Sequence, residues 1–209
     1  MTPPQKKETG RLEAFSDGVF AIAITLLVLE LKVPSASQDP ATLASNLLKQ
    51  WPNYLALVTS FFTVLIMWVH HHMLFRLVQR VDSMLLFANG LLLLLVSVVP
   101  YPTAVVAEYL TTPAATVACA FYSGVFVLIG IAFYLLVMAA FRPAVLDPGA
   151  PQALVLRIRR SYRWGPPLYL LATIAAPFEP WVSMGINSAL WIFWAVMTRE
   201  LCSSPAAFE

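Results

Sequence analysis

The chain has 209 residues, of which 59% are hydrophobic and only 11% are charged, and its formal net charge is +2. Soluble globular proteins carry about 25% charged residues. This composition therefore excludes a water-facing surface and leaves no room for a separate soluble catalytic or nucleic-acid-binding domain. We expect an all-α integral membrane protein in which residues 1–209 form one transmembrane subunit.

The predicted elements are six membrane-spanning helices. A helix needs about 20 mainly apolar residues to cross a bilayer, and charged or proline-rich segments separate six apolar stretches in this chain. The predicted spans are residues 14–33, 51–74, 84–107, 114–141, 164–178 and 181–198. The fifth is short and begins at Gly165-Pro166-Pro167, which fits a tilted or re-entrant course.

The first span has two different faces. At 100° per residue, one arc of about 100° carries four side chains, and Phe15 and Gly18 extend it toward the N-terminus. The four residues are Ile22, Thr25, Leu26 and Leu29. Asp17 lies about 140° from Ile22, so we expect Ser16 and Asp17 to face neighbouring helices. A cleaved signal peptide is a weaker interpretation, because acidic residues bracket the apolar stretch.

The second and third spans contain polar side chains that could meet this carboxylate. Trp68 and His72 are four residues apart and share one helical face, and Asn89 lies inside the third span. Three consecutive histidines cannot all bind one metal ion, since successive helical residues diverge by 100°. We expect no metal site and no cofactor. A pH-sensing role for His72 remains an alternative, because histidine titrates near neutrality.

Lysine and arginine are retained on the cytoplasmic side of a membrane. With six spans, eleven of the thirteen lysines and arginines fall on the side of the two termini, and only Lys32 and Lys49 lie on the other side. Both termini are therefore predicted to be cytoplasmic, in a multi-pass protein of the cell inner membrane. The cluster from Arg157 to Arg163 is interpreted as an anchor of this kind, with a contact to anionic lipid as the alternative.

The stretch "RLEAFSDGVFAIAITLLVLEL" resembles the Arg-x-x-x-Phe-Ser-Asp signature of the transmembrane protein 175 family of potassium channels. "WVHHHMLF" and "NGLLLLLVSVVPYPT" resemble the second and third helices of that family. Animal members carry two six-helix repeats and this chain carries one signature, so the resemblance implies a homotetramer of six-helix subunits around a central pore.

The resemblance also implies roles for individual residues. Ile22 would form the narrowest ring of a pore lined by the first helix of each subunit, with Thr25, Leu26 and Leu29 continuing the lining. The remaining positions would form a structural or gating network, and these are Arg11, Phe15, Ser16, Asp17, Trp68, His72 and Asn89. The expected function is a potassium-permeable leak channel with K⁺ as the permeant ion and the lipid bilayer as its surroundings.

Three other functions remain as alternatives. A proton-conducting channel would use the same pore. A secondary transporter needs polar cavities and helices interrupted at mid-membrane, and here proline and glycine gather at the ends of the spans. An enzyme needs converging catalytic groups, and no nucleophile accompanies Asp17 and His72. The chain lacks a "TVGYG" loop, so strong selection by backbone carbonyls is not expected.

Overall fold

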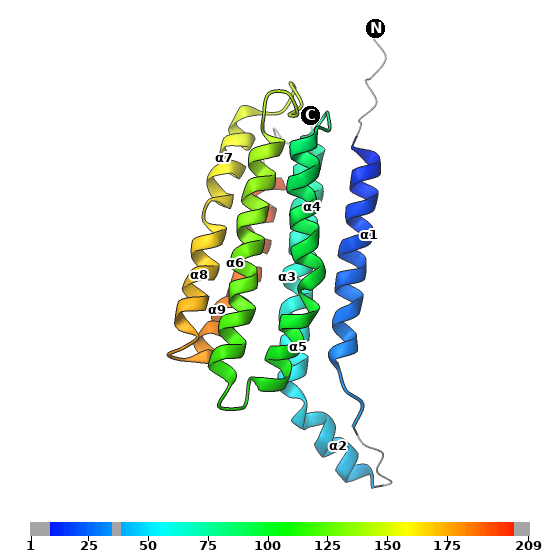
Figure 1. Ribbon diagram of the computed structural model, residues 1–209, viewed down its shortest axis with the longest axis vertical. Helices are drawn as coiled ribbons and strands as arrows, with labels where there is room; N and C mark the ends of the chain where they lie inside the picture. The colour runs from blue at the N-terminus through cyan, green and yellow to red at the C-terminus, as the bar shows by residue number, and fades with distance from the viewer. Residues whose placement is uncertain (1–8, 35–38, 203–209) are drawn as a thin grey trace.

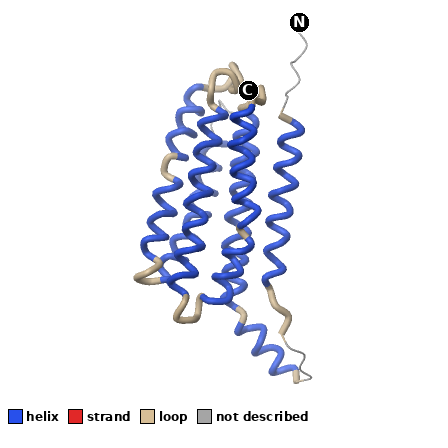
Figure 2. Tube along the Cα trace, viewed as in Figure 1, coloured by secondary structure: helices blue, strands red, loops and turns tan. Residues whose placement is uncertain are grey.

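The computed structural model describes the backbone of residues 9–34 and 39–202 and the side chains as far as residue 198. The named elements in that part of the chain are all helical (Figure 1, Figure 2). They are α1 (Gly10–Leu26), the 3₁₀ helix η1 (Leu27–Glu30), α2 (Pro40–Lys49), α3 (Trp51–Arg76), α4 (Ser83–Val98), α5 (Pro100–Tyr109), α6 (Ala115–Ala140), α7 (Gln152–Tyr162), α8 (Gly165–Ala175) and α9 (Pro180–Cys202).

Five of the predicted spans correspond to long apolar helices. Among the described residues, five helical segments of 19 to 27 residues are long and apolar enough to cross a bilayer. They are Gly10–Glu30, Trp51–Arg76, Ser83–Tyr109, Ala115–Ala140 and Pro180–Thr198. This confirms the prediction of an all-helical membrane protein, with five of the six predicted spans found as long apolar helices.

The fifth predicted span, residues 164–178, differs from the others. It contains α8, whose 11 residues extend about 16 Å, roughly half of a 30 Å hydrocarbon core. Helix α7 continues the same rod toward the other end of the bundle (Figure 1). Pro166 and Pro167 lack the N–H groups that an uninterrupted helix would need, so α8 begins as a new helix. A sixth crossing therefore requires α7 and α8 together.

Two further differences lie on either side of residues 35–38. The first helix was predicted to reach residue 33, but it ends as a 3₁₀ turn at Glu30, and Leu31 is extended. Pro34 favours an extended residue before it, which opposes helix at this point. Helix α2 was not predicted, although Asp39 caps it by accepting hydrogen bonds from the N–H groups of Ala41 and Thr42, and Pro40 suits the first helical position.

Helix α6 lies at the centre of the packing and α1 at its edge. In the most hydropathic stretch of α6, 61% of the residues are buried, whereas the figure for α1 is 22%. Helix α1 packs on α3 and α4, on the side of the bundle away from α7 and α8 (Figure 1). Gly130 of α6 lets α8 approach closely, because a Cβ there would lie 3.2 Å from the backbone N of Pro166. Because only 22% of the α1 stretch is buried, most of this helix is not covered by its own subunit.

Candidate functional site: the uncovered face of helix α1

Helix α1 packs through one face and leaves the opposite face open. Ser16, Phe20 and Ala23 are buried against the neighbouring helices, and Leu27 continues this face into η1. These positions recur every three or four residues, which places them on one side of a helix. Apart from Asp17 and Thr25, the residues between them are apolar or glycine, so packing against α3 and α4 covers only part of a hydrophobic surface.

The open face carries the residues predicted to line a pore. Ile22 is 60% exposed, Leu26 39% and Leu29 71%, and Thr25 is also exposed. The hydroxyl of Thr25 donates to the backbone carbonyl of Ile22 over 2.9 Å. Leu29 lies on the 3₁₀ turn, where each residue advances 120° rather than 100°, so its direction differs from the one expected for an α-helix. The structure places all four side chains on a surface that their own subunit does not cover.

A buried hydrogen-bonded chain joins α1 to α3 and α4. The hydroxyl of Ser16 donates to the carbonyl of Leu12 over 2.8 Å and accepts from the amide N of Asn89 over 3.0 Å. The amide oxygen of Asn89 accepts from Nε2 of His71 over 2.8 Å, because that oxygen has no proton to donate. The ring of His71 stacks on Phe75 with centroids 4.3 Å apart. Each of the three polar side chains is nearly inaccessible to solvent.

A second contact, closer to the surface, involves the carboxylate of the signature. The indole N–H of Trp68 donates to Oδ1 of Asp17 over 2.8 Å. The exposed ring of His72 stacks on Trp68 with centroids 6.1 Å apart. Arg11 and Phe15 are exposed and take no part in these hydrogen bonds within the described residues. Of the seven residues predicted for the network, the structure brings five into two neighbouring sets of contacts.

His71 is the partner that the sequence analysis did not single out. It continues a spacing of three and four residues on α3 through Val64, Met67 and Leu74, all of which are buried. That periodicity marks His71 as an inward-facing histidine, whereas His72 aligns with Trp68. The third histidine, His70, is also buried, and its ring nitrogens contact the hydroxyls of Tyr162 and Thr198. Among the described residues, no three His, Cys, Asp or Glu side chains are placed to hold a metal ion.

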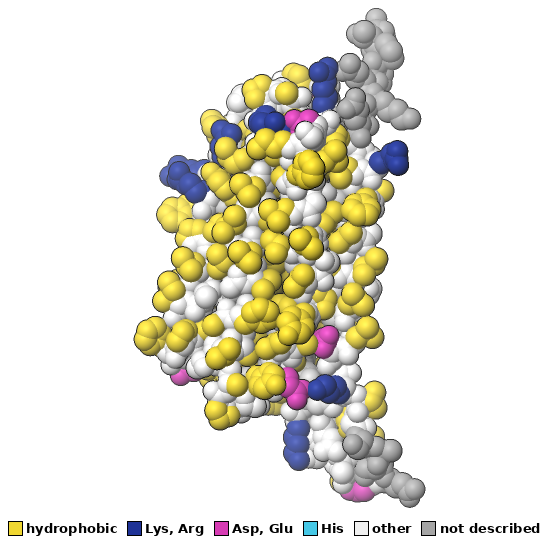
Figure 3. All heavy atoms as spheres, viewed as in Figure 1, with side chains coloured by type: hydrophobic (Ala, Val, Ile, Leu, Met, Phe, Trp, Pro, Cys, Tyr) yellow, Lys and Arg dark blue, Asp and Glu magenta, His cyan; other side chains and the backbone are white. Residues whose placement is uncertain are grey.

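Charges gather at the two ends of the bundle and leave an apolar band between them (Figure 3). At the end where α1 begins, Arg142 pairs with Asp82, whose carboxylate also accepts from the backbone N–H of Leu85. That N–H and the Arg142 guanidinium lower the pKa of Asp82 below its ordinary value. At the opposite end, Lys32 pairs with Glu108 over 2.5 Å, and this hydrogen bond raises the pKa of Lys32.

Comparison with known proteins gives consistent matches. Residues 11–100 match the family model described as "Endosomal/lysosomal potassium channel TMEM175". A protein of Chamaesiphon minutus named as a potassium channel is 49% identical over 94% of this chain and 98% of its own length. The crystal structure of a lysosomal potassium-selective channel TMEM175 homolog from the same organism aligns with a TM-score of 0.83 and 48% identity, covering 91% of this chain and 98% of that one.

A more distant relative carries a different functional name. The human protein named "Endosomal/lysosomal proton channel TMEM175" is 38% identical over 46% of this chain, which spans only 20% of that longer protein. The similarity to the bacterial channel covers nearly the whole of both chains, and it confirms the resemblance seen in the Arg-x-x-x-Phe-Ser-Asp signature. The chain is therefore a multi-pass membrane protein that belongs to the TMEM175 family, a family of ion channels and not of enzymes.

Proposed function

We propose that the chain forms a potassium-permeable channel in which the open faces of α1 from four subunits surround a central pore and Ile22 forms its narrowest ring. The observation that carries this proposal is the exposure of Ile22, Leu26 and Leu29 on a helix whose other face is buried. A homotetramer would bring the four copies of this face together. The potassium-channel names of the bacterial relatives support K⁺ as the permeant ion.

The chemistry of this face determines how ions would be selected. The carbonyls of α1 are engaged in helical hydrogen bonds, and the open face presents mainly aliphatic side chains. A ring of isoleucines narrows a water column until it empties, so an ion passes only when the side chains withdraw and part of its hydration is lost. K⁺ loses water more readily than Na⁺. The expected result is a modest preference for K⁺, with the hydroxyl of Thr25 as a polar layer one turn from the constriction.

The polar contacts of α1 have a supporting role in this proposal. The bonds from Trp68 to Asp17 and from Asn89 to Ser16 fix the rotation of α1 about its axis, and that rotation decides whether Ile22 points toward the pore. Arg11 and Phe15 would lie at the cytoplasmic mouth. We expect Asp17→Ala to reduce assembly and leave ion preference unchanged, and an assembled channel with altered preference would contradict this role.

The proposed orientation places both termini in the cytoplasm of a bacterial inner membrane. The first residues of α1 and the last residues of α9 lie at the same end of the bundle (Figure 1), which requires an even number of crossings. Helices α7 and α8 supply the sixth crossing in this arrangement. The arginines of the 142–163 region share that end, and Lys32 and Lys49 occupy the other, in agreement with retention of positive charge in the cytoplasm.

Replacement of Ile22 by asparagine tests the constriction. A polar ring at this position keeps water in the pore, so Ile22→Asn should raise Na⁺ and Cs⁺ flux into proteoliposomes. Val28→Asn is the matched control, because Val28 is 54% exposed on the same helical segment but lies outside the proposed lining. Equal selectivity and flux in Ile22→Asn and wild type would place the constriction elsewhere. Counting subunits in the purified protein tests the tetramer separately.

Proton conduction through the same pore is the second candidate. The name of the human relative, a proton channel, favours it. A narrow apolar pore that excludes hydrated cations can still hold a transient chain of water molecules, which carries protons. Reversal potentials measured under separate K⁺ and proton gradients distinguish the two candidates, because the potential follows the gradient of the ion that carries the current.

A further inference from the structure

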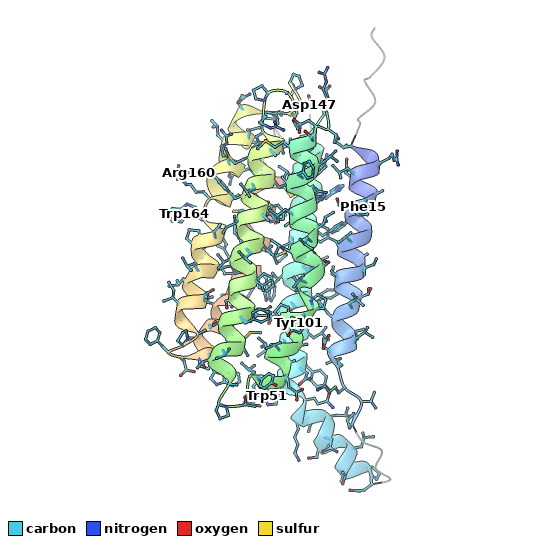
Figure 4. All side chains as sticks on the ribbon, in the orientation of Figure 1. Phe15, Trp51, Tyr101, Asp147, Arg160 and Trp164 are labelled. Carbon is cyan, nitrogen blue, oxygen red and sulfur yellow. The ribbon has the colours of Figure 1, made fainter. Side chains whose placement is uncertain are left out.

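Helix α7 has a basic outer face that the proposed pore does not use. Arg159, Arg160 and Arg163 are exposed, and between them lie Leu156, which is 62% exposed, and Trp164, which is 56% exposed. The opposite side of the helix is buried against the bundle through Val155, Ile158 and Tyr162. Figure 4 shows Arg160 and Trp164 projecting from the side of the bundle opposite α1.

The helical spacing of the side chains on this outer face continues for two residues beyond the end of α7. Arg163 and Trp164 keep right-handed helical dihedrals, so the spacing of 100° per residue applies to them as well. Arg159, Arg163 and Arg160 then fall within an arc of about 100°, with Leu156 near its middle and Trp164 beside it. The three cations and the two apolar side chains therefore form one surface.

No acidic side chain neutralises this surface within the described residues. The sequence from 148 to 178 contains no Asp or Glu, and α6, against which α7 packs, contains none either. The ion pairs of Lys32 with Glu108 and of Arg142 with Asp82 do not involve this surface. An anion is the partner that its charge fits, and the neighbouring described segments supply none.

We infer that the outer face of α7 binds the headgroup of an anionic phospholipid, with Leu156 and Trp164 at the boundary of the acyl chains. The arginine guanidinium makes two parallel hydrogen bonds to a phosphate, and tryptophan favours the interface between lipid and water. Helix α8 continues from this point toward the opposite end of the bundle (Figure 1), and its exposed Leu170, Leu171 and Ile174 are apolar. An acidic soluble protein matches the arginines but gives no reason for the exposed leucine and tryptophan next to them.

The inner side of α7 connects this lipid site to the core. The ring of Tyr162 stacks on Phe133 with centroids 5.2 Å apart, and its hydroxyl contacts His70 of α3. His70 also contacts Thr198 of α9 over 2.6 Å. A headgroup bound on the outer face therefore stabilises α7 in the position in which Tyr162 contacts α3 and α6, and with it the junction of α7 and α8.

Native mass spectrometry of the purified channel tests the inference with phosphatidylglycerol and phosphatidylcholine of identical acyl chains. Each arginine near a membrane surface contributes enough to change the affinity for an anionic lipid about fivefold. The double variant Arg160→Gln with Arg163→Gln should therefore weaken phosphatidylglycerol binding on the order of 25-fold and leave phosphatidylcholine binding unchanged. Phosphatidylglycerol should also raise the melting temperature of the wild type and not that of the variant.

Two control variants show whether an effect comes from the charge of these arginines and from their position on α7. Arg160→Lys with Arg163→Lys keeps both charges and should keep the preference for phosphatidylglycerol. Arg80→Gln removes an exposed arginine of another segment and should leave the preference unchanged. The inference is overturned if the wild type binds both lipids equally, if the double glutamine variant keeps the preference, or if a glutamate-rich peptide binds the face more tightly than phosphatidylglycerol does.

Discussion

Asn89 links α4 to both α1 and α3, and its removal should cost the subunit a measurable part of its stability. The side chain is 1% exposed and makes two hydrogen bonds, one from His71 and one to Ser16. Hydrogen bonds between membrane helices contribute about 0.6 kcal/mol each on average. In Asn89→Ala the buried N–H of His71 also loses its acceptor, which costs about 1–3 kcal/mol. We expect a total loss of about 2–4 kcal/mol.

The loss can be read as a shift in melting temperature. For a chain of this size, 1 kcal/mol corresponds to about 2–4 °C, so Asn89→Ala should melt about 4–16 °C below the wild type when unfolding is followed by size-exclusion chromatography of heated detergent samples. Ser97→Ala is the matched control on α4, because Ser97 is exposed and its hydroxyl bonds only to the carbonyl of Leu94. If the two variants melt at the same temperature, the buried chain from Ser16 to His71 contributes nothing to the packing of α1.

Three other changes test separate parts of the fold. Gly130→Leu should lower the melting temperature strongly, since the new side chain meets the backbone of Pro166 at 3.2 Å, whereas Gly124→Ala, with nothing within 4 Å of its Cβ, should change it little. The pKa of Asp82 is lowered in the folded state, so its charge stabilises the fold at any pH above 3.8, the ordinary pKa of the group. This contribution is lost as the pH falls through the pKa of the folded state. A melting curve against pH should therefore fall less steeply in acid for Asp82→Asn than for the wild type. Lys32→Ala should leave the melting temperature unchanged, because both side chains of its ion pair are more than half exposed and such pairs contribute little; a clear loss would contradict this view of the loop.

The long apolar helices were predictable because their cause is local. A run of about 20 apolar residues must leave water whatever its neighbours are, so the stretches that became α3 and α6 could be recognised within two residues of their ends. Helix α2 carries a local signal too, the Asp39-Pro40 pair at its start, but it has only ten residues and mixes polar with apolar side chains, so apolar length alone does not detect it.

The candidate site was predictable only in part. The helical wheel separated Ile22 from Asp17. In the folded chain both side chains are exposed, and only Asp17 bonds to a neighbouring helix, through Trp68 of α3. It could not decide which histidine meets Asn89, because that depends on the rotation of α3 relative to α4. The structure selects His71, which shares a buried face of α3 with Met67 and Leu74, and leaves His72 at the surface against Trp68.

The sequence by itself determined that this chain lies in a membrane, that its helices are apolar rods and that the first of them carries an aliphatic stripe next to a Ser-Asp pair. These properties follow from transfer energies and from the helical repeat, which each segment has independently of the others. Only the tertiary structure decided that α7 and α8 meet end to end, that α6 occupies the centre and that α1 keeps one face uncovered. Those outcomes depend on which surfaces fit together, such as Gly130 against Pro166. The hydrophobic periodicity of one segment does not show which distant segment its surface fits.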